Sequence, residues 1–522
     1  MSRNGSGIGG EERAAAALLR LLACSLLCAL ACSSPPLLVS PRDETTSLSP
    51  PATGALVRLS SLVRERAAPG ESGFLPLAGN ADALRWRLAL IDSAVSTIDL
   101  QTYLWKNDAT GRLLVRRLVQ AAKRGVRVRV LADDFLAAPD GRLAAALSQH
   151  PHLEVRFFNP FHNRERRNVT TAIEWLRRPE LNHRMHNKLL VTDGLVAVAG
   201  GRNMADEYFG LNERQNFADL DVIAVGPVVE DFEHAFDDYW NDEWAVPAAE
   251  LTRVPSTDDA LGHGQLELSE AERVRLSSFP LERSDWSQEL DRLAEMLRFG
   301  RALGVTDDPR ELRGGLPNQV FLSLGTLLEG IERELLLVSA YFVPDADHVA
   351  TLASLVAHGV RVRVFTNSLA SNNHSVVNSQ YKKWRRPLLE AGVELYEMRH
   401  DPRDLEAIDT PPVSARSHVL HTKAVLVDRH RAYVGALNLS PRGVRINAEN
   451  GLLIDSADIG AQLSSLFEEQ MQARNAWRVR LEPDGSLTWE SGDARVRRQP
   501  ARTTSQRMAD WFYGLFPLAG QI

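Results

Sequence analysis

An internal duplication constrains the fold of this 522-residue chain more than any other feature of its sequence. A histidine and a lysine separated by one residue are followed by four mostly apolar residues and an aspartate, and later by a glycine and an asparagine. Each residue of the second copy lies 235 positions after its counterpart, as His421 lies after His186. A solenoid repeat is only about 20–50 residues long, so we expect two whole lobes of one fold. The copies are HNKLLVTDG at 186–194 with Gly200 and Asn203, and HTKAVLVD at 421–428 with Gly435 and Asn438.

Each lobe begins with a strand–helix–strand pattern, which predicts an α/β fold with parallel pairing of the two strands. The helix-like segments have apolar residues at helical spacing and end at a glycine, and the VRVRV segments alternate as strands do. We expect the valines of VRVRV to face one way and its arginines to lie on a solvated or helix-covered face. The segments are 96–105, 108–125 and 126–134 in the first lobe, and 334–344, 348–359 and 360–368 in the second.

The repeat and the local composition divide the chain into six segments. The connector between the lobes lacks the repeat, and we expect it to pack on the body. Its Ser269-x-x-Glu272 predicts a capping box at the start of a short helix. The segments are a signal-like stretch at 1–32, a Ser/Pro/Thr-rich tether and lead-in at 33–80, the first lobe at 81–245, the connector at 246–316, the second lobe at 317–475 and a tail at 476–522.

Charge and cysteine usage exclude some classes of protein. The net charge of −7 argues against a general nucleic-acid binder, which usually presents a basic face, so we expect no nucleic-acid partner. The basic run KKWRR at 382–386 is interpreted as a solvated helix face. All three cysteines lie at or before Cys32, so the rest of the chain has neither a disulfide nor a thiolate metal site.

The N-terminal stretch resembles a bacterial lipoprotein signal. Two arginines precede an apolar run of eleven residues at 21–31, which has the length of a signal-peptide core and is short for a membrane span. Cys32 follows it and is the predicted lipidation site, with Cys24 as a competing site. An uncleaved anchor helix from about Ala14 and cleaved secretion remain alternatives. We expect a membrane-associated protein of the bacterial cell envelope that faces the periplasm.

The geometry of an extended strand suggests what the motif can bring together. Residues i and i+2 face the same side, so His186 and Lys188 project together, as do His421 and Lys423. Asp193 would lie roughly 23 Å from His186 at about 3.3 Å per residue, so we interpret the motif aspartates, Asp193 and Asp428, as structural.

A hairpin after the motif would bring GGRN and GALN beside the histidines. If Asp193 pairs with Val196, Asn203 lies opposite His186, and a one-residue change of register keeps the same neighbourhood. We expect the small residues of GGRN and GALN to leave room for a bulky tetrahedral group.

Two histidines, two lysines and two asparagines suit a phosphodiester. One neutral imidazole can attack phosphorus, while the other, protonated, gives a proton to the leaving oxygen. Lys188, Lys423, Asn203 and Asn438 can hold the non-bridging oxygens. The ammonium groups supply the positive charge, so we expect no metal and no other cofactor. Zinc binding by His183 and His186, or by His418 and His421, is disfavoured, because residues i and i+3 of a strand face opposite sides.

The paired motifs resemble the HKD signature of the phospholipase D superfamily, over about residues 84–472. The resemblance implies two α/β lobes about a pseudo-two-fold axis with one active site between them. It implies that His186 forms a phosphohistidine and that His421 acts as the acid. It also suggests Asp219 in FADLDV and Glu449 in NAENGLLI as acidic partners of the histidines. Ala436 stands where the family prefers glycine or serine.

Several further segments resemble the C-type cardiolipin synthases of bacteria. Such enzymes would join phosphatidylglycerol to a second phospholipid or alcohol at a membrane surface. A phospholipase D hydrolase and, less favoured, a phosphodiesterase or nuclease on the same fold are the alternatives. The segments are GGRNMADEYFG, SAYFVPD, FTNSLASNN, YKKWRRPLLEAGVELYEM and NLSPRGVRINAENGLLI.

The C-terminal segment MADWFYGLFPLAG has apolar residues at largely helical spacing. Two interpretations of this helix remain open. It packs on the body as an ordinary terminal helix, or it lies in a membrane interface with its aromatic side chains at the headgroup level.

Overall fold

The computed structural model describes residues 44–135, 141–161, 178–252, 266–316 and 318–522. The chain divides into two compact units, of which residues 43–160 and 182–522 form the larger. The larger unit contains both lobes. The predictions for Cys32, the signal-like stretch and the tether up to residue 43 lie outside the described residues.

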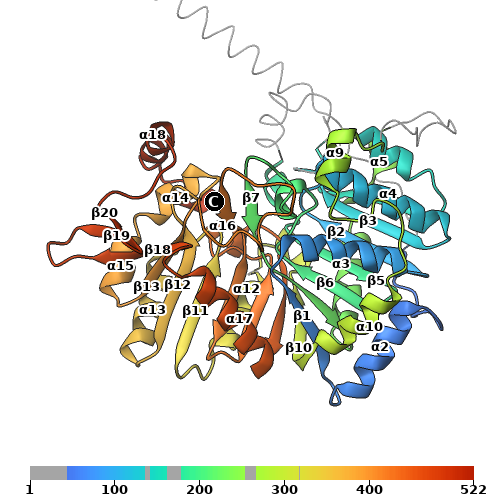
Figure 1. Ribbon diagram of the computed structural model, residues 1–522, viewed down its shortest axis with the longest axis horizontal. Coiled ribbons are helices and arrows are strands. Elements are labelled where there is room, and N and C mark those ends of the chain that lie inside the picture. Colours follow the sequence, from blue (N-terminus) through green and yellow to red (C-terminus); the bar gives the residue numbers. More distant parts are fainter. Residues whose placement is uncertain (1–43, 136–140, 162–177, 253–265, 317) are drawn as a thin grey trace, which may run out of the picture. The chain divides into compact units, whose positions relative to one another are not determined.

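The two lobes share one strand order, which confirms the predicted duplicated α/β fold (Figure 1). In each lobe three adjacent strands pair in parallel, and every other pair of neighbouring strands is antiparallel. The first lobe has the order β9 (Ala245–Pro247), β4 (Leu153–Phe158), β3 (Arg127–Asp133), β2 (Thr97–Thr102), β5 (Leu189–Thr192), β6 (Val196–Gly200), β8 (Asp221–Val225) and β1 (Ser72–Leu77). The second has β18 (Ala476–Leu481), β13 (Glu394–Met398), β12 (Arg361–Asn367), β11 (Glu334–Ser339), β15 (Lys423–Val427), β16 (Arg431–Gly435) and β17 (Asn450–Asp455).

The connector contributes a strand that joins the two sheets. Strand β10 (Arg298–Thr306) pairs with β1 at one end, where Ser72 lies opposite Gly300, and with β17 along the rest of its length. The tail likewise begins with a strand of the second lobe, because β18 pairs with β13 and leads into β19 (Leu487–Ser491) and β20 (Ala494–Val496). The predicted capping box is confirmed at the start of α9 (Glu270–Arg275), where Ser269 and Glu272 cap each other.

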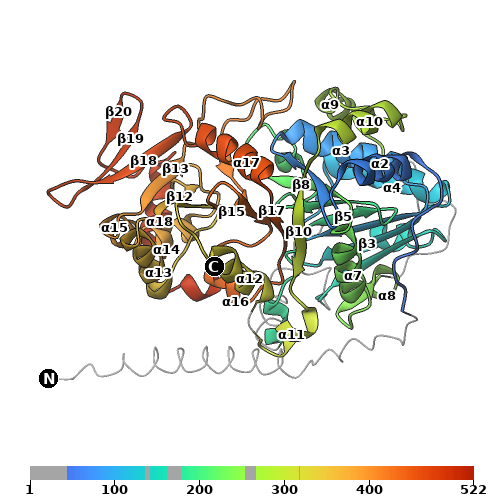
Figure 2. The same cartoon turned by 90° about the horizontal axis from the view of Figure 1, so that it is seen from below.

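Helices cover both faces of each sheet, as Figure 2 shows for the first lobe. A core cluster beneath α7 and α17 contains buried residues of both lobes, among them Phe232 and Phe467, so the lobes are packed as one body. The helices of the first lobe are α2 (Ala55–Arg66), α3 (Asn80–Ser93), α4 (Ala109–Lys123), α5 (Gly141–Leu147) and α7 (Val229–Trp240). The second has α12 (Gln319–Leu328), α13 (Ala346–Ala357), α14 (Ser375–Tyr381), α15 (Arg385–Glu390), α16 (Pro441–Arg445) and α17 (Ala457–Gln470).

The arginine face of VRVRV is covered by a helix at Arg129. This side chain is buried, forms two hydrogen bonds of 2.7 and 2.8 Å with the Asp99 carboxylate, and lies over the ring of Phe236 on α7. A buried guanidinium requires such a carboxylate partner, since an unpaired charge in the core would be strongly destabilising.

The hairpin register differs by one residue from the sequence prediction. Thr192 pairs with Val196 in the first lobe, and Val427 pairs with Arg431 in the second, so neither motif aspartate is part of the ladder. Asp193 and Asp428 both have φ of 53°, in the left-handed region, and therefore belong to the turn rather than to the strand.

Candidate active site

The two histidines are held at the interface of the lobes by backbone contacts that cross it. His186 N donates to Ala448 O at 2.8 Å, and His421 N donates to Ala218 O at 2.7 Å. Each of these alanines directly precedes an acidic residue of the opposite lobe. The second contact extends a short parallel sheet of β7 (Asn216–Ala218) and β14 (His418–Leu420). The two halves of the site are therefore related in the way that the duplication predicts.

Each histidine contacts the acidic residue of the other lobe. His186 Nδ1 lies 2.7 Å from Glu449 Oε2, and His421 Nδ1 lies 2.6 Å from Asp219 Oδ2. All four side chains are buried. A carboxylate at Nδ1 fixes the orientation of an imidazole and leaves Nε2 as its reactive nitrogen.

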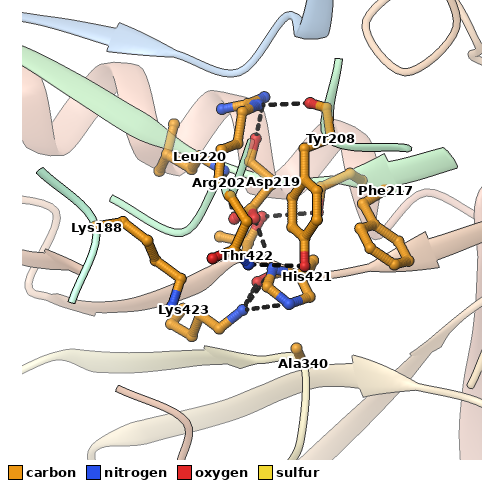
Figure 3. A network of polar contacts seen from close by, with 12 residues as sticks. Lys188, Arg202, Tyr208, Phe217, Asp219, Leu220, Ala340, His421, Thr422 and Lys423 are labelled. Atoms are coloured by element: carbon orange, nitrogen blue, oxygen red, sulfur yellow. Dashed lines mark hydrogen bonds and ion pairs between the residues drawn. The ribbon is translucent and has the colours of Figure 1, made fainter. Parts of the chain in front are cut away.

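The two lysines lie beside the histidines of their own motifs. Lys188 Nζ donates to His186 O and Lys423 Nζ donates to His421 O. Lys423 Nζ also lies 2.6 Å from His421 Nδ1 and 3.2 Å from its Nε2. Figure 3 shows Lys188 and Lys423 approaching each other next to His421. The site therefore concentrates cationic groups where a phosphodiester would bind.

Burial lowers the pKa values of both histidines and both lysines of the site. It lowers the pKa of Lys188 to about 7 and that of Lys423 to about 8. Burial, together with the charge of Lys423, lowers the pKa of His421 to about 4. Burial and the charges of Lys188 and Lys423 lower the pKa of His186 well below its ordinary value of 6.5. In the free protein the site thus favours a neutral His186.

The environments of the two carboxylates differ. Burial alone would raise the pKa of Asp219, but His421 and Lys423 outweigh it and hold that pKa below its ordinary value. Arg202 adds positive charge there, and its Nη2 donates to Asp219 O at 2.7 Å. Burial raises the pKa of Glu449 well above its ordinary value, and neighbouring Asp307 contributes to the rise.

Asp307 directly follows β10 and binds the backbone of Glu449. Its Oδ2 accepts from Glu449 N at 2.8 Å, and Asp307 N donates to Glu449 O at 3.1 Å. Burial raises the pKa of Asp307 itself to about 7. Arg202 and Asp307 thus make the surroundings of the two acidic partners electrostatically unequal, although the motifs themselves are equivalent.

Aromatic rings surround the histidines. Tyr103 meets the His186 ring edge-on at a centroid distance of 4.9 Å, and Phe217 stacks on His421 at 5.1 Å. Tyr208 and Tyr341 lie 5.1 and 6.3 Å from His421. These four rings were not predicted as part of the site. The duplication could have revealed Tyr103 and Tyr341, because each follows the first parallel strand of its lobe.

The two motif asparagines have different surroundings. Asn203 accepts from Leu104 N at 3.1 Å and donates to the Tyr208 hydroxyl at 2.8 Å, so both ends of its amide are engaged. Asn438 Oδ1 is buried and has no hydrogen-bond partner among the described residues. Asn203 Nδ2 has a second N–H group that can bind a phosphate oxygen, whereas the unpartnered Oδ1 of Asn438 can only accept a hydrogen bond.

The small residues of the motif accommodate the acidic partner rather than leaving empty space. A Cβ atom added to Gly201 would collide with Asp219 Oδ1, and one added to Gly200 would collide with Asp221. Ala436 stands at the position equivalent to Gly201 and is fully buried. The prediction that these residues leave room for a tetrahedral group is therefore wrong for Gly200 and Gly201.

The histidines of the zinc alternative have other partners. His183 Nδ1 lies 2.9 Å from Ile446 O, and His418 Nε2 lies 3.0 Å from Asp409. Across the described part of the chain, no three His, Cys, Asp or Glu side chains are grouped so that they could hold a metal ion.

Both motif aspartates bind the first residues of a parallel strand. The carboxylate of Asp193 accepts from the backbone N–H groups of Val95, Ser96 and Thr97, and that of Asp428 accepts from those of Glu332, Arg333 and Glu334. Neither contacts a histidine in any of these hydrogen bonds. The geometry agrees with a structural role.

We expect Asp193→Ala to lower the free energy of unfolding by about 2–3 kcal/mol, and Asp428→Ala by about 1 kcal/mol. Hydrogen bonds to a charged group contribute about 1.5–3 kcal/mol, and a donor left unpaired in the interior is costly. Asp193 is buried, whereas the region around Asp428 is partly exposed and water can replace the lost contacts. Urea unfolding measures both values, and the equal φ of the two residues cancels backbone effects. Equal losses, or inactivity of either folded variant, would contradict the structural role.

We expect kcat/KM to fall as the pH rises above about 7–8, because the buried Lys188 and Lys423 lose their protons there. An ordinary lysine would remain charged up to about pH 10.4. In that window the unfolded chain binds more protons than the folded one, so the same lysines make stability rise with pH while activity falls. On the acid side kcat/KM should rise from pH 6.5 toward pH 4, because His186 stays neutral while His421, the expected acid, gains its proton there. A profile that is flat up to pH 9.5 would be inconsistent with charged lysines in catalysis.

The two-lobe fold and the paired His–Lys motifs at the lobe interface define an enzyme of the phospholipase D type. The chain belongs to the family described as "Cardiolipin synthase, PLD-like domain", whose model matches residues 88–240 and 326–471. These ranges include both histidines, both lysines, Asp219 and Glu449.

Curated relatives agree with this assignment, and a solved structure shares the fold. The chain is 34% identical to cardiolipin synthase C of Escherichia coli over 86% of this chain and 96% of that protein. It is 28% identical to cardiolipin synthase A of Pseudomonas syringae over 72% of this chain and 64% of that protein. The structure of phosphatidylserine synthase from Haemophilus influenzae has the same fold, with a TM-score of 0.52 at 16% identity, covering 80% of this chain and 92% of that one.

Proposed function

We propose that this protein is a cardiolipin synthase that transfers a phosphatidyl group from phosphatidylglycerol to the hydroxyl of a second phospholipid. The observation that supports this most directly is the pair of cross-lobe histidine–carboxylate contacts beside two buried lysines. Similarity to cardiolipin synthase C over nearly the whole of that relative supports the choice of substrate.

In the first half-reaction, His186 Nε2 attacks the phosphorus of phosphatidylglycerol. A P–N bond forms, the P–O bond to the headgroup glycerol breaks, and the leaving oxygen takes a proton from His421 Nε2. The negative charge of the bound phosphodiester favours the protonated form of His421 that this step needs. Lys188 and Lys423 stabilise the charge that develops on the non-bridging oxygens.

In the second half-reaction, the free hydroxyl of another phospholipid attacks phosphorus and gives its proton to His421. The P–N bond breaks and His186 is restored. With phosphatidylglycerol as both donor and acceptor, two molecules yield one cardiolipin and one glycerol. Water in place of the second hydroxyl would give phosphatidic acid, which is the phospholipase D alternative.

The difference between the two carboxylates supports this assignment of roles. A charged Asp219 favours an imidazolium at His421, as a general acid requires. Glu449 has a raised pKa and therefore stabilises a positive charge on His186 less. This favours the neutral imidazole that a nucleophile requires. The same proposal assigns Asn438 a contact with a substrate hydroxyl, because its unpartnered amide oxygen accepts hydrogen bonds.

The proposed substrates require contact with a membrane surface. No helix among the described residues is long and apolar enough to cross a bilayer. We propose that lipidation of Cys32 holds the enzyme at the periplasmic side of the cell envelope, and that no nucleic acid, metal or other cofactor takes part.

The function is tested by expressing the chain in a bacterium that lacks its own cardiolipin synthases and analysing the extracted lipids. We expect cardiolipin to accumulate with the native chain and to be absent with His186→Ala at equal expression. Accumulation of phosphatidic acid without cardiolipin would favour the hydrolase. An unchanged lipid profile with nicking of nucleic acid by the purified chain would favour the nuclease alternative.

A further inference from the structure

The last helix of the chain exposes an apolar surface. Helix α18 (Thr504–Tyr513) and the turn after it hold six of the thirteen large hydrophobic side chains that are exposed among the described residues. Met508 and Trp511 are each 65% exposed, and Leu515 is 60% exposed. A contiguous patch of this kind on a folded surface indicates an interaction site. The patch consists of Met508, Trp511, Phe512, Tyr513, Leu515 and Phe516.

The opposite side of α18 packs against the second lobe. Asp510 is buried, and its carboxylate accepts from Asn378 at 2.6 Å, from Lys382 at 2.8 Å and from Gln499 at 2.9 Å. Figure 1 shows α18 at the edge of the second lobe above α14. The polar side of the helix is therefore its packed side, and the apolar patch is held outward. An ordinary terminal helix would bury its apolar side instead.

Helix α18 is connected to a residue beside His421. Gln506 of α18 donates to the carbonyl of Asn372 at 3.4 Å. The next residue, Asn373, accepts from the Tyr341 hydroxyl at 3.0 Å, and the Tyr341 ring lies 6.3 Å from that of His421. Beyond the helix the chain returns to α16, where Arg442 N donates to Ile522 O at 2.9 Å. Two hydrogen bonds and one ring contact thus link α18 to His421.

The charges around the patch indicate the chemistry of its partner. From Arg497 to the C-terminus the chain has four arginines and one acidic residue, Asp510, which is buried and paired. Arg497, Arg498 and Arg502 are exposed. This local positive charge contrasts with the net charge of −7 of the whole chain. Exposed aromatic residues flanked by basic residues fit the interface of a bilayer that contains anionic phospholipids.

We propose that α18 and the turn after it dock the enzyme onto the surface of a bilayer containing anionic phospholipids and orient the active site toward its lipid substrate. This inference rests on the proposed function. A second copy of the chain is a poorer occupant, because its equivalent patch would have the same charge. The helix lies on the membrane and does not cross it.

The test compares Trp511→Ala/Phe512→Ala with the native full-length chain on two forms of phosphatidylglycerol. On vesicles of phosphatidylglycerol and phosphatidylethanolamine we expect the rate to fall at least about tenfold, because burying two aromatic side chains contributes more than 1.4 kcal/mol. On short-chain phosphatidylglycerol below its micellar concentration the rate should be unchanged, which also shows that the variant is folded.

Leu303→Ala/Leu322→Ala is the matched control, since it removes two leucines that are 52% and 50% exposed on other parts of the surface. It should leave both rates unchanged. Equal vesicle rates for the native chain and the Trp511/Phe512 variant would overturn the docking role, as would a dimer that dissociates in that variant without a change of rate. A native chain inactive on both forms of substrate would instead contradict the proposed function.

Discussion

His421→Ala is expected to retain a phosphatidyl group bound to the protein, whereas His186→Ala is expected to lose both turnover and covalent attachment. The two histidines are equivalent by sequence, but only one can attack phosphorus while the other transfers protons. Without the general acid, attack by His186 is slowed by about 10²–10⁴ and yet remains chemically open. Without the nucleophile, no P–N bond can form.

The measurement uses phosphatidylglycerol labelled at its phosphorus, followed by a rapid alkaline quench that preserves phosphohistidine. His348→Ala is a suitable control, because His348 is a partly exposed histidine of the second lobe that pairs with Asp345. That variant should retain full turnover. Label on His186→Ala would reverse the assignment, and full turnover by either active-site variant would refute the mechanism.

Asp219→Asn is expected to cost about 10³–10⁴ in kcat, and Glu449→Gln only about 10–10². In a serine protease triad, the equivalent change of carboxylate to amide costs about 10⁴. Asp219 has a lowered pKa, so it is negatively charged and stabilises a protonated His421. Glu449 has a raised pKa, so its replacement by a neutral amide removes less charge.

Both substitutions preserve the size of a buried side chain, so each variant serves as the control for the other. Near-ultraviolet circular dichroism should show the native signal for both. Labelling should also show that Asp219→Asn still forms the covalent adduct slowly, since its nucleophile is intact. Equal losses would contradict the inequality of the two carboxylates, and a larger loss for Glu449→Gln would mean that the roles of the two lobes are exchanged.

The main features of the fold and the site follow from the sequence because the duplication is preserved residue by residue. Two copies of His-x-Lys at a constant offset predict two similar lobes, and FADLDV and NAENGLLI, through the family resemblance, direct attention to Asp219 and Glu449. The pairing of each acid with the histidine of the other lobe was not predicted, because it depends on how the lobes meet.

Other features depend on contacts between segments that share no pattern. The hairpin register is one residue away from the prediction because Asp193 and Asp428 bind the starts of strands about 95 residues earlier instead of extending the ladder. Strand β10 has no repeat partner in the sequence, and its pairing with both lobes appears only in the fold. Arg202 and Asp307 distinguish the two carboxylates, but nothing in their local sequence relates them to a histidine.

A phosphohistidine on this protein is proposed to be resolved by a lipid hydroxyl rather than by water. The most direct test is to incubate the purified full-length chain with vesicles of phosphatidylglycerol labelled in the acyl chains and to quantify the products. We predict cardiolipin as the main labelled product, with glycerol released in equal amount and no product from His186→Ala. Phosphatidic acid as the main product at saturating phosphatidylglycerol would contradict the claim.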